Sequence, residues 1–438
     1  MKQYIFLPLI TAFSLALTAC GGSSSNEENN SLSELPDDTS ASQKQTISLQ
    51  AYTYQCGVDS PYQQADIVFH DKEGEPLGSA KTDVQGKFSD SIPVDTVHIS
   101  VLGEVRDYQN EEYTLIISEL DIQGRTNLGN FYFENYTDSC GCENYELDTV
   151  ELGNIGNDYR LQTSYGIELN DTVEICPNEN KIYLMAVADN GLDAKAAVLD
   201  IPKDSFTVKL KESDFSHQAV EVLTDYSQNV DYISTRGYIP EENQFRFVNS
   251  KNNYNYDPLQ IFPSITEHNF YVQSDFESSY VDKVGVDFFS YARNSVNADG
   301  TYTLTELPLI SEELAVSLLQ FADSTDLDYD FSSADNRFGR SQWTFSFLVY
   351  DAMESRFDWT IKSGIRGQLP DLSFGEVFPE PQADLALEEL DLLLYGYAGN
   401  ATDTASYTQL LETIAVGGHL TKAEFSNYVY LSMTAKLD

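Results

Sequence analysis

The chain has 438 residues and a formal net charge of -45, because it contains 70 Asp and Glu residues but only 25 Lys and Arg residues. Proteins bind the phosphate backbone of nucleic acids through Lys and Arg, so this charge argues against nucleic acid as a direct partner. Hydrophobic residues make up 41 % of the chain, which is enough for packed cores and excludes a chain that is disordered throughout.

The first 19 residues have the parts of an export signal. Lys2 gives a charged start, an apolar segment runs from about Tyr4 to Leu17, and small residues precede Cys20. An apolar segment of roughly 14 residues is too short to span a membrane, which takes about 20. The arrangement resembles the lipobox of bacterial lipoproteins. This resemblance implies cleavage before Cys20, acylation of the Cys20 thiol and attachment to a membrane through the lipid.

The residues after Cys20 indicate a destination and a tether. Gly21 stands where an inner-membrane retention signal would have Asp, so the resemblance implies the outer membrane, with the leaflet left open. Residues 20–44 contain almost no apolar side chains and many Ser, Asn, Glu and Asp, which is the composition of a disordered tether. We therefore expect a signal peptide at 1–19 and a tether at 20–44.

Short alternating segments separated by turns predict a β-sandwich that begins at about residue 45. The sequence Thr82-Asp83-x-x-Gly86-x-Phe88 within it resembles the carboxypeptidase-regulatory-like (transthyretin-like) domain. The resemblance covers about 45–105 and, with a strand-like extension, gives a first domain at 45–156. It implies a β-sandwich with an accessory, non-catalytic role.

Four cysteines remain besides Cys20, and they are Cys56, Cys140, Cys142 and Cys176. An even number of thiols in an oxidising compartment predicts two disulfides. Cys140 and Cys142 bond each other poorly, because a disulfide needs Cα atoms about 5–6 Å apart in a particular orientation. We therefore expect Cys56 to pair with one of these two and Cys176 with the other. A four-thiolate zinc or copper site is the alternative, although the spacing lacks the C-x-x-C knuckles of structural zinc sites.

Residues 157–438 have the pattern of a larger antiparallel β-rich region, either undivided or split into two subdomains. Two helical candidates lie within it, at 308–321 and at 404–416, where apolar residues recur at helical spacing, and a buried strand is the alternative for either segment. Residues 428–434 predict a closing strand. The expected fold class is therefore mainly β: an N-terminal β-sandwich, then an antiparallel β-rich region with one or two short helices.

The sequence contains no motif of a known catalytic site. The five histidines are scattered without metal-ligand spacing, and neither a G-x-S-x-G elbow nor a phosphate-binding glycine loop is present. We therefore expect no enzyme activity, no catalytic residues and no metal ligands. Asp326, Asp328 and Asp330 alternate like the start of a calcium loop, but Phe331 stands where that loop needs glycine. No cofactor is expected, and calcium is kept as an alternative.

One loop has the composition of a sugar-binding site. Asn252, Asn253, Tyr254 and Tyr256 offer amides for hydrogen bonding and aromatic rings for stacking. These four residues are the candidate ligand-binding residues, and a glycan is the candidate ligand.

The expected function is a non-catalytic one. We expect an outer-membrane lipoprotein that binds a protein partner or a glycan, or serves as an accessory subunit, in the cell envelope. The alternatives are a hydrolase of an extracellular polymer, with carboxylates that the sequence does not identify, and a structural spacer of a surface complex. A buried acidic pair in a cleft with raised pKa values would favour the hydrolase. An aromatic or apolar face would favour binding.

Overall fold

The computed structural model describes residues 45–437 except 57, 137–139, 224–229, 243, 253–257, 282, 351–354, 380, 382–383, 398–403, 416–419, 421 and 423–424. Strands dominate these residues and helices are few and short, which confirms the mainly β fold class. The predicted signal peptide, Cys20 and the tether lie outside the described residues.

The first folded unit is a β-sandwich. Its strands are β1 (Thr46–Gln55), β2 (Val58–Pro61), β3 (Asp66–His70), β4 (Pro76–Lys81), β5 (Lys87–Ser91), β6 (His98–Arg106), β7 (Glu112–Glu119) and β8 (Asn127–Glu134). In one sheet β1 pairs with β2, β5 and β8, and in the other the order is β7-β6-β3-β4. Ile47, Ile67 and Phe131 lie in the core between the sheets. Gly86 adopts φ +72°, and a Cβ added there would lie 2.3 Å from the carbonyl oxygen of Ala51, so the turn requires glycine.

A second β-sandwich follows along the chain. Its elements are β9 (Glu143–Glu151), α1 (Ile155–Asp158), β10 (Tyr159–Thr163), β11 (Thr172–Ile175), β12 (Lys181–Ala188), β13 (Ala194–Asp200), β14 (Thr207–Lys211), a 3-10 turn η1 (Glu212–Asp214) and β15 (His217–Gln218). The two sheets have the orders β11-β9-β14 and β10-β12-β13-β15, and Leu147, Leu184 and Leu210 pack between them. β9 lies in the extension that the sequence assigns to the first domain, and it pairs with strands of the second sandwich.

The C-terminal part of the chain completes a large sheet, which has twelve strands among the described residues. The strands of this part are β16 (Val220–Val222), β17 (Tyr232–Ile239), β18 (Gln244–Asn252), β19 (Leu259–Ile261), β20 (His268–Val281), β21 (Val284–Val296), β22 (Asp328–Asp330), β23 (Arg340–Val349), β24 (Ser355–Gly364), β25 (Arg366–Gln368), β26 (Leu385–Tyr397) and β27 (Tyr428–Lys436). Two separate pairs, β16 with β19 and β22 with β25, lie outside the large sheet. The order of the large sheet is β18-β17-β20-β21-β27-β26-β23-β24-β7-β6-β3-β4. β24 and β7 pair in parallel, and this pair joins the C-terminal region to the first sandwich.

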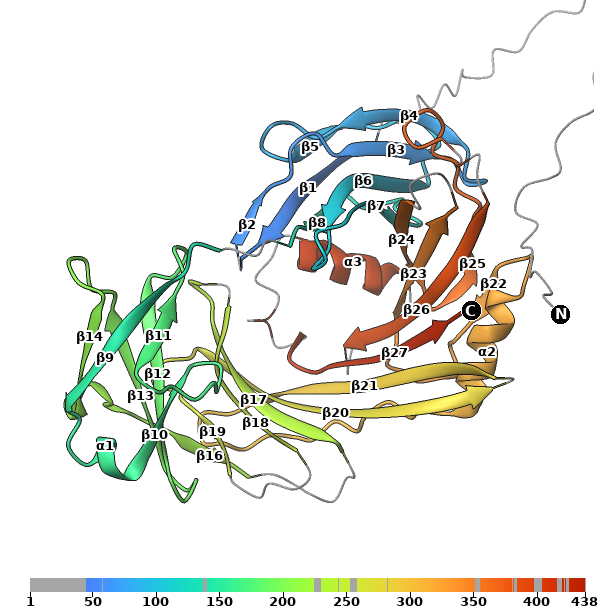
Figure 1. Ribbon diagram of the computed structural model, residues 1–438. Coiled ribbons are helices and arrows are strands. Elements are labelled where there is room, and N and C mark those ends of the chain that lie inside the picture. Colours follow the sequence, from blue (N-terminus) through green and yellow to red (C-terminus); the bar gives the residue numbers. More distant parts are fainter. Residues whose placement is uncertain are drawn as a thin grey trace, which may run out of the picture.

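Two helices lie on opposite faces of this sheet. Figure 1 shows the sheet bending around α3 (Thr404–Ala415), while α2 (Glu312–Ala322) packs on the other face. Both predicted helices and the predicted closing strand are confirmed. α2 begins at Glu312 rather than at 308 because Ser311 has an extended backbone, with φ -143°, and occupies the N-cap position. No helix in the described part of the chain is both long and apolar enough to cross a membrane.

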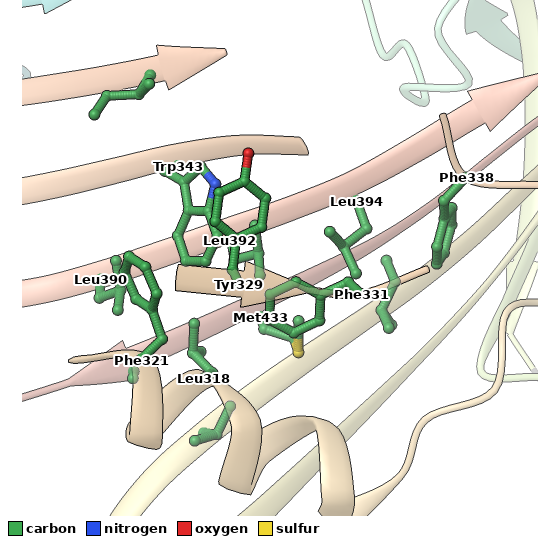
Figure 2. Packing of buried hydrophobic residues seen from close by; sticks show 14 of the residues in the cluster. Leu318, Phe321, Tyr329, Phe331, Phe338, Trp343, Leu390, Leu392, Leu394 and Met433 are labelled. Atoms are coloured by element: carbon green, nitrogen blue, oxygen red, sulfur yellow. The ribbon is translucent and has the colours of Figure 1, made fainter. Parts of the chain in front are cut away.

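The face of the sheet that α2 covers is apolar (Figure 2). Leu390, Leu392 and Leu394 alternate along β26 and are fully buried. Trp343 of β23 packs against Phe321 of α2, with ring centroids 4.2 Å apart. We call this the outer face. The intervening side chains of the same strands point to the opposite side, which we call the inner face, because side chains alternate along a strand.

A chain of buried hydrogen bonds crosses from the first sandwich to β24. His70 Nε2 lies 2.9 Å from Ser100 Oγ, which lies 2.7 Å from Ser118 Oγ. Trp359 Nε1 donates to Ser118 Oγ over 2.9 Å. His70 Nδ1 lies 3.2 Å from the carbonyl oxygen of Gly74, which can only accept, so Nδ1 carries the proton and Nε2 accepts from Ser100. The chain connects β3, β6, β7 and β24.

Candidate functional site

Five tyrosines lie together on the inner face of the large sheet. Tyr291 belongs to β21, Tyr428 and Tyr430 belong to β27, and Tyr395 and Tyr397 belong to β26. The strand register places Tyr430 between Tyr291 and Tyr395, and it places Tyr397 opposite Tyr428. We call these five residues the tyrosine cluster.

The rings of the tyrosine cluster form a continuous group. The ring centroids of Tyr291 and Tyr430 are 4.5 Å apart with an interplanar angle of 15°, and those of Tyr397 and Tyr428 are 5.0 Å apart. Tyr397 is buried, whereas the other four tyrosines are half-buried. Burial raises the pKa of Tyr397 and the pKa of Tyr430 to about 12, so both hydroxyls are protonated at neutral pH and can donate hydrogen bonds.

α3 packs against one end of the tyrosine cluster. Leu410 of this helix forms a small apolar group with Tyr397 and Phe425. The carboxylate of Glu412 accepts a hydrogen bond of 2.6 Å from the backbone N–H of Thr126, just before β8. α3 is therefore held against the first sandwich and covers one end of the cluster.

A buried arginine lies beside the tyrosine cluster. Arg293 of β21 is 9 % exposed, and its guanidinium lies over the rings of Phe270, at 4.9 Å, and Tyr428, at 5.4 Å. Its Nη2 donates to the carbonyl oxygen of Phe425 over 3.1 Å. Arg236 of β17 lies close enough for its charge to act on Arg293. Burial lowers the pKa of Arg293, but an arginine remains charged at neutral pH.

Acidic side chains occupy the other end of β26 on the inner face. Glu389 and Asp391 are hydrogen-bonded to each other, and the hydroxyl of Thr434 donates to Asp391. Burial, followed by the charge of Asp391, raises the pKa of Glu389. Burial also raises the pKa of Asp391, to which the charge of Asp358 contributes. The pair therefore holds a proton to a higher pH than two solvated carboxyls would.

A buried charge cluster lies between the first sandwich and the C-terminal strands. Glu119, at the end of β7 and 5 % exposed, lies 3.0 Å from Arg125, 3.0 Å from Arg340 and 3.4 Å from Lys362. Arg340 and Lys362 come from β23 and β24, and Arg125 precedes β8. Burial alone would raise the pKa of Glu119, but the three cations together hold it below its usual value. The cluster thus fastens the sandwich to the C-terminal strands.

The four cysteines form two disulfides, Cys56–Cys140 and Cys142–Cys176. This is one of the two connectivities that the sequence left open. Because both bonds use all four thiols, these cysteines do not form a four-thiolate metal site. The bonds attach the segment between the sandwiches to β1 on one side and to β11 on the other.

The candidate ligand-binding loop lies almost entirely outside the described residues. Asn252 is the last residue of β18, an edge strand of the large sheet, while Asn253, Tyr254 and Tyr256 fall in the part that the structure leaves undescribed. The prediction that this loop binds a glycan remains a prediction.

The acidic run that resembled a calcium loop forms a short strand. Asp328 and Asp330 belong to β22, which pairs with β25. The carboxylate of Asp330 accepts a hydrogen bond of 2.9 Å from the backbone N–H of Ser332. Across the described ranges, no group of three or more His, Cys, Asp or Glu side chains is arranged to hold a metal ion.

No residue of the tyrosine cluster is among the candidate site residues that the sequence indicates, although the sequence contains part of the pattern. Tyr395 and Tyr397 are two residues apart, as are Tyr428 and Tyr430, so a strand places each pair on one face. Tyr291 is distant in the sequence, and only the strand order β21-β27-β26 brings it to the others.

Comparison with protein families, with curated proteins and with solved structures gives no match for this chain. The candidate site is therefore defined by its own geometry. It is the inner face, with the tyrosine cluster at its centre, Arg293 and Arg236 beside the cluster, and Glu389 and Asp391 at the other end of β26. Aromatic rings with hydroxyl groups, a few charged side chains and rigid strands beneath them are the components of a ligand-binding surface.

Proposed function

We propose that the protein is an outer-membrane lipoprotein that binds a glycan through the tyrosine cluster, without converting it chemically. The observation that carries this proposal is the continuous group of tyrosine rings on the inner face, four of which are half-buried. The lipobox resemblance at Cys20 supports attachment to the membrane. The resemblance of residues 45–105 to carboxypeptidase-regulatory-like domains supports an accessory role.

A sugar chain suits this surface because sugar rings have both apolar and polar sides. Their C–H faces stack on aromatic rings, and their hydroxyls form hydrogen bonds at the ring edges. Tyr395, Tyr430 and Tyr291 form a row that runs across three neighbouring strands, so an extended glycan can contact several of them. Sheet hydrogen bonds fix these strands on both sides, so little ordering is needed on binding.

Replacing Tyr430 with alanine is expected to weaken glycan binding about tenfold, because the loss of one stacking ring costs about 1–1.5 kcal/mol. Tyr430→Phe keeps the ring and should retain most of the affinity. Affinity electrophoresis of the full-length protein against a panel of soluble polysaccharides identifies a ligand, and calorimetry with that ligand measures the change.

Tyr280→Ala is the matched control, since Tyr280 is 77 % exposed near the end of β20 and lies outside the tyrosine cluster. Its affinity should equal that of the native protein. The proposal fails if the native protein binds no polysaccharide of the panel, or if it binds one with an affinity that Tyr430→Ala does not change.

A hydrolase is the second candidate, and the raised pKa values of Glu389 and Asp391 favour it. Two hydrogen-bonded carboxyls with raised pKa values can act as a general acid and a general base. For a hydrolase, Asp391→Asn should abolish the release of reducing ends and leave binding in place. If the native protein releases no reducing ends from a polysaccharide that it binds, this candidate fails.

A further inference from the structure

Buried arginines of this protein are paired with carboxylates, and Arg293 is the exception within the described residues. Arg125 and Arg340 share Glu119, and Arg246 lies 3.3 Å from each of two glutamates. Arg293 is 9 % exposed, which is comparable with the 4 %, 8 % and 3 % of these three. It forms no ion pair with any carboxylate that the structure describes.

The groups around Arg293 compensate its charge only in part. The rings of Phe270 and Tyr428 lie against the guanidinium, and the carbonyl oxygen of Phe425 accepts from Nη2. The Nε atom of Arg293 is buried and has no hydrogen-bond partner among the described residues. Burying a charge away from water is unfavourable unless the charge is paired and fully hydrogen-bonded. The guanidinium of Arg293 can therefore still bind an anion.

A second cation, Arg236, lies on the same face as Arg293, on the far side of β20. The strand register places Arg236 of β17 opposite Phe270, whose ring lies against Arg293. The Nε atom of Arg236 is also buried without a partner in the part of the chain that the structure describes. Its charge acts on Arg293 and on Tyr430. The two positive charges repel each other, and an anion that reaches both guanidinium groups would offset that repulsion.

We propose that Arg293 and Arg236 bind an anionic group of the glycan, a carboxylate or a sulfate ester, so that the ligand is an acidic polysaccharide. This inference rests on the proposed function and adds the class of ligand. A guanidinium binds such groups through paired N–H donors, and the adjoining tyrosines stack the sugar ring that carries the group. The net charge of -45 repels acidic polymers at long range, and salt screens that repulsion more than it screens a partly buried contact.

The test compares polymers that are matched except for their charge. The full-length protein in detergent is titrated with polygalacturonate and with its fully methyl-esterified form, and then with a sulfated galactan and its desulfated form, at about 0.15 M salt. We expect one acidic polymer to bind about tenfold tighter than its neutral counterpart. The pair that shows the difference identifies the carboxylate or the sulfate.

Variants of the two arginines test their role. Arg293→Gln is expected to abolish the preference, so that the ratio of the affinities for the acidic and the neutral polymer falls from about ten to about one. Arg236→Gln should also reduce the preference for the acidic polymer. Arg236 is only half-buried, so if Arg293→Gln does not fold, the result for Arg236→Gln tests the proposal. Arg366→Gln is the matched control, because Arg366 is exposed on β25 and lies outside the large sheet.

The outcomes separate this inference from a structural role and from the proposed function. Removal of an unpaired buried charge should leave the melting temperature unchanged or raise it. A lower melting temperature of Arg293→Gln with the preference retained would indicate a structural role and overturn the inference. Equal binding of acidic and neutral polymers by the native protein would also overturn it, while glycan binding would stand. No binding of either form, or of the wider panel, would overturn both.

Discussion

Replacing Glu119 with glutamine is expected to lower the free energy of unfolding by about 3–5 kcal/mol. The substitution keeps the size of the side chain and removes the negative charge that Arg125, Arg340 and Lys362 share. The two arginines are 4 % and 8 % exposed, so water cannot replace the lost carboxylate. Urea denaturation at neutral pH, followed by tryptophan fluorescence, measures the difference in free energy.

Glu112→Gln is the control for this experiment. Glu112 is on the same strand but pairs with Arg106 at the surface, where an ion pair contributes less than about 1 kcal/mol. A double variant, Glu119→Gln with Arg340→Gln, should recover part of the loss because one uncompensated charge is removed with its partner. If Glu119→Gln lowers the free energy of unfolding as little as Glu112→Gln does, the buried charge cluster does not fasten the first sandwich to the C-terminal strands.

Acidification from pH 6.5 to pH 4 is expected to destabilise the native protein by about 3 kcal/mol more than its His70→Asn variant. Burial lowers the pKa of His70 from 6.5 to about 4, and the charge of His98 contributes to this shift. In this range the unfolded chain binds a proton that the folded chain does not. The stabilisation by neutral His70 is therefore complete above pH 6.5 and is lost as the pH falls to about 4.

The measurement is the free energy of unfolding in urea at a series of pH values between 7 and 4. Asparagine at position 70 does not titrate, and its amide can still donate to the carbonyl oxygen of Gly74, as the ring does now. His217→Asn is the control, since His217 lies on the short strand β15 and is partly exposed. Parallel pH profiles for the native protein and His70→Asn would contradict the expected role of His70.

Local patterns in the sequence predict whether a segment forms a strand or a helix. They do not predict which strands lie side by side in a sheet. The alternation in 428–434 predicted β27, and the apolar spacing in 308–321 predicted α2, because each pattern depends on neighbours within a few residues. The pairing of β24 with β7 depends on two segments at distant places in the chain, and no local pattern indicates it. The same limit applies to β9, whose partners are set by the second sandwich.

The candidate site was harder to predict than the fold because its defining property is an arrangement in space. Tyr395 and Tyr397 look like ordinary residues of a strand, and their role emerges only where β26 meets β27 and β21. What distinguishes Arg293 from Arg340 is the presence or absence of a neighbouring carboxylate, which the sequence does not record. The disulfide pairing was easier to predict than the tyrosine cluster, because the geometry of a disulfide bond disfavours a bond between Cys140 and Cys142.

The parallel pairing of β24 with β7 has a consequence for the order of folding. Thr114 pairs with Phe357, so the contact order of this sheet is high and its central hydrogen bonds close only after almost the whole chain is available. Until then β7 is an open strand edge, which is a template for association with another chain. A truncated protein that ends before β24 is therefore expected to aggregate through β7, whereas the full chain covers this edge with β24.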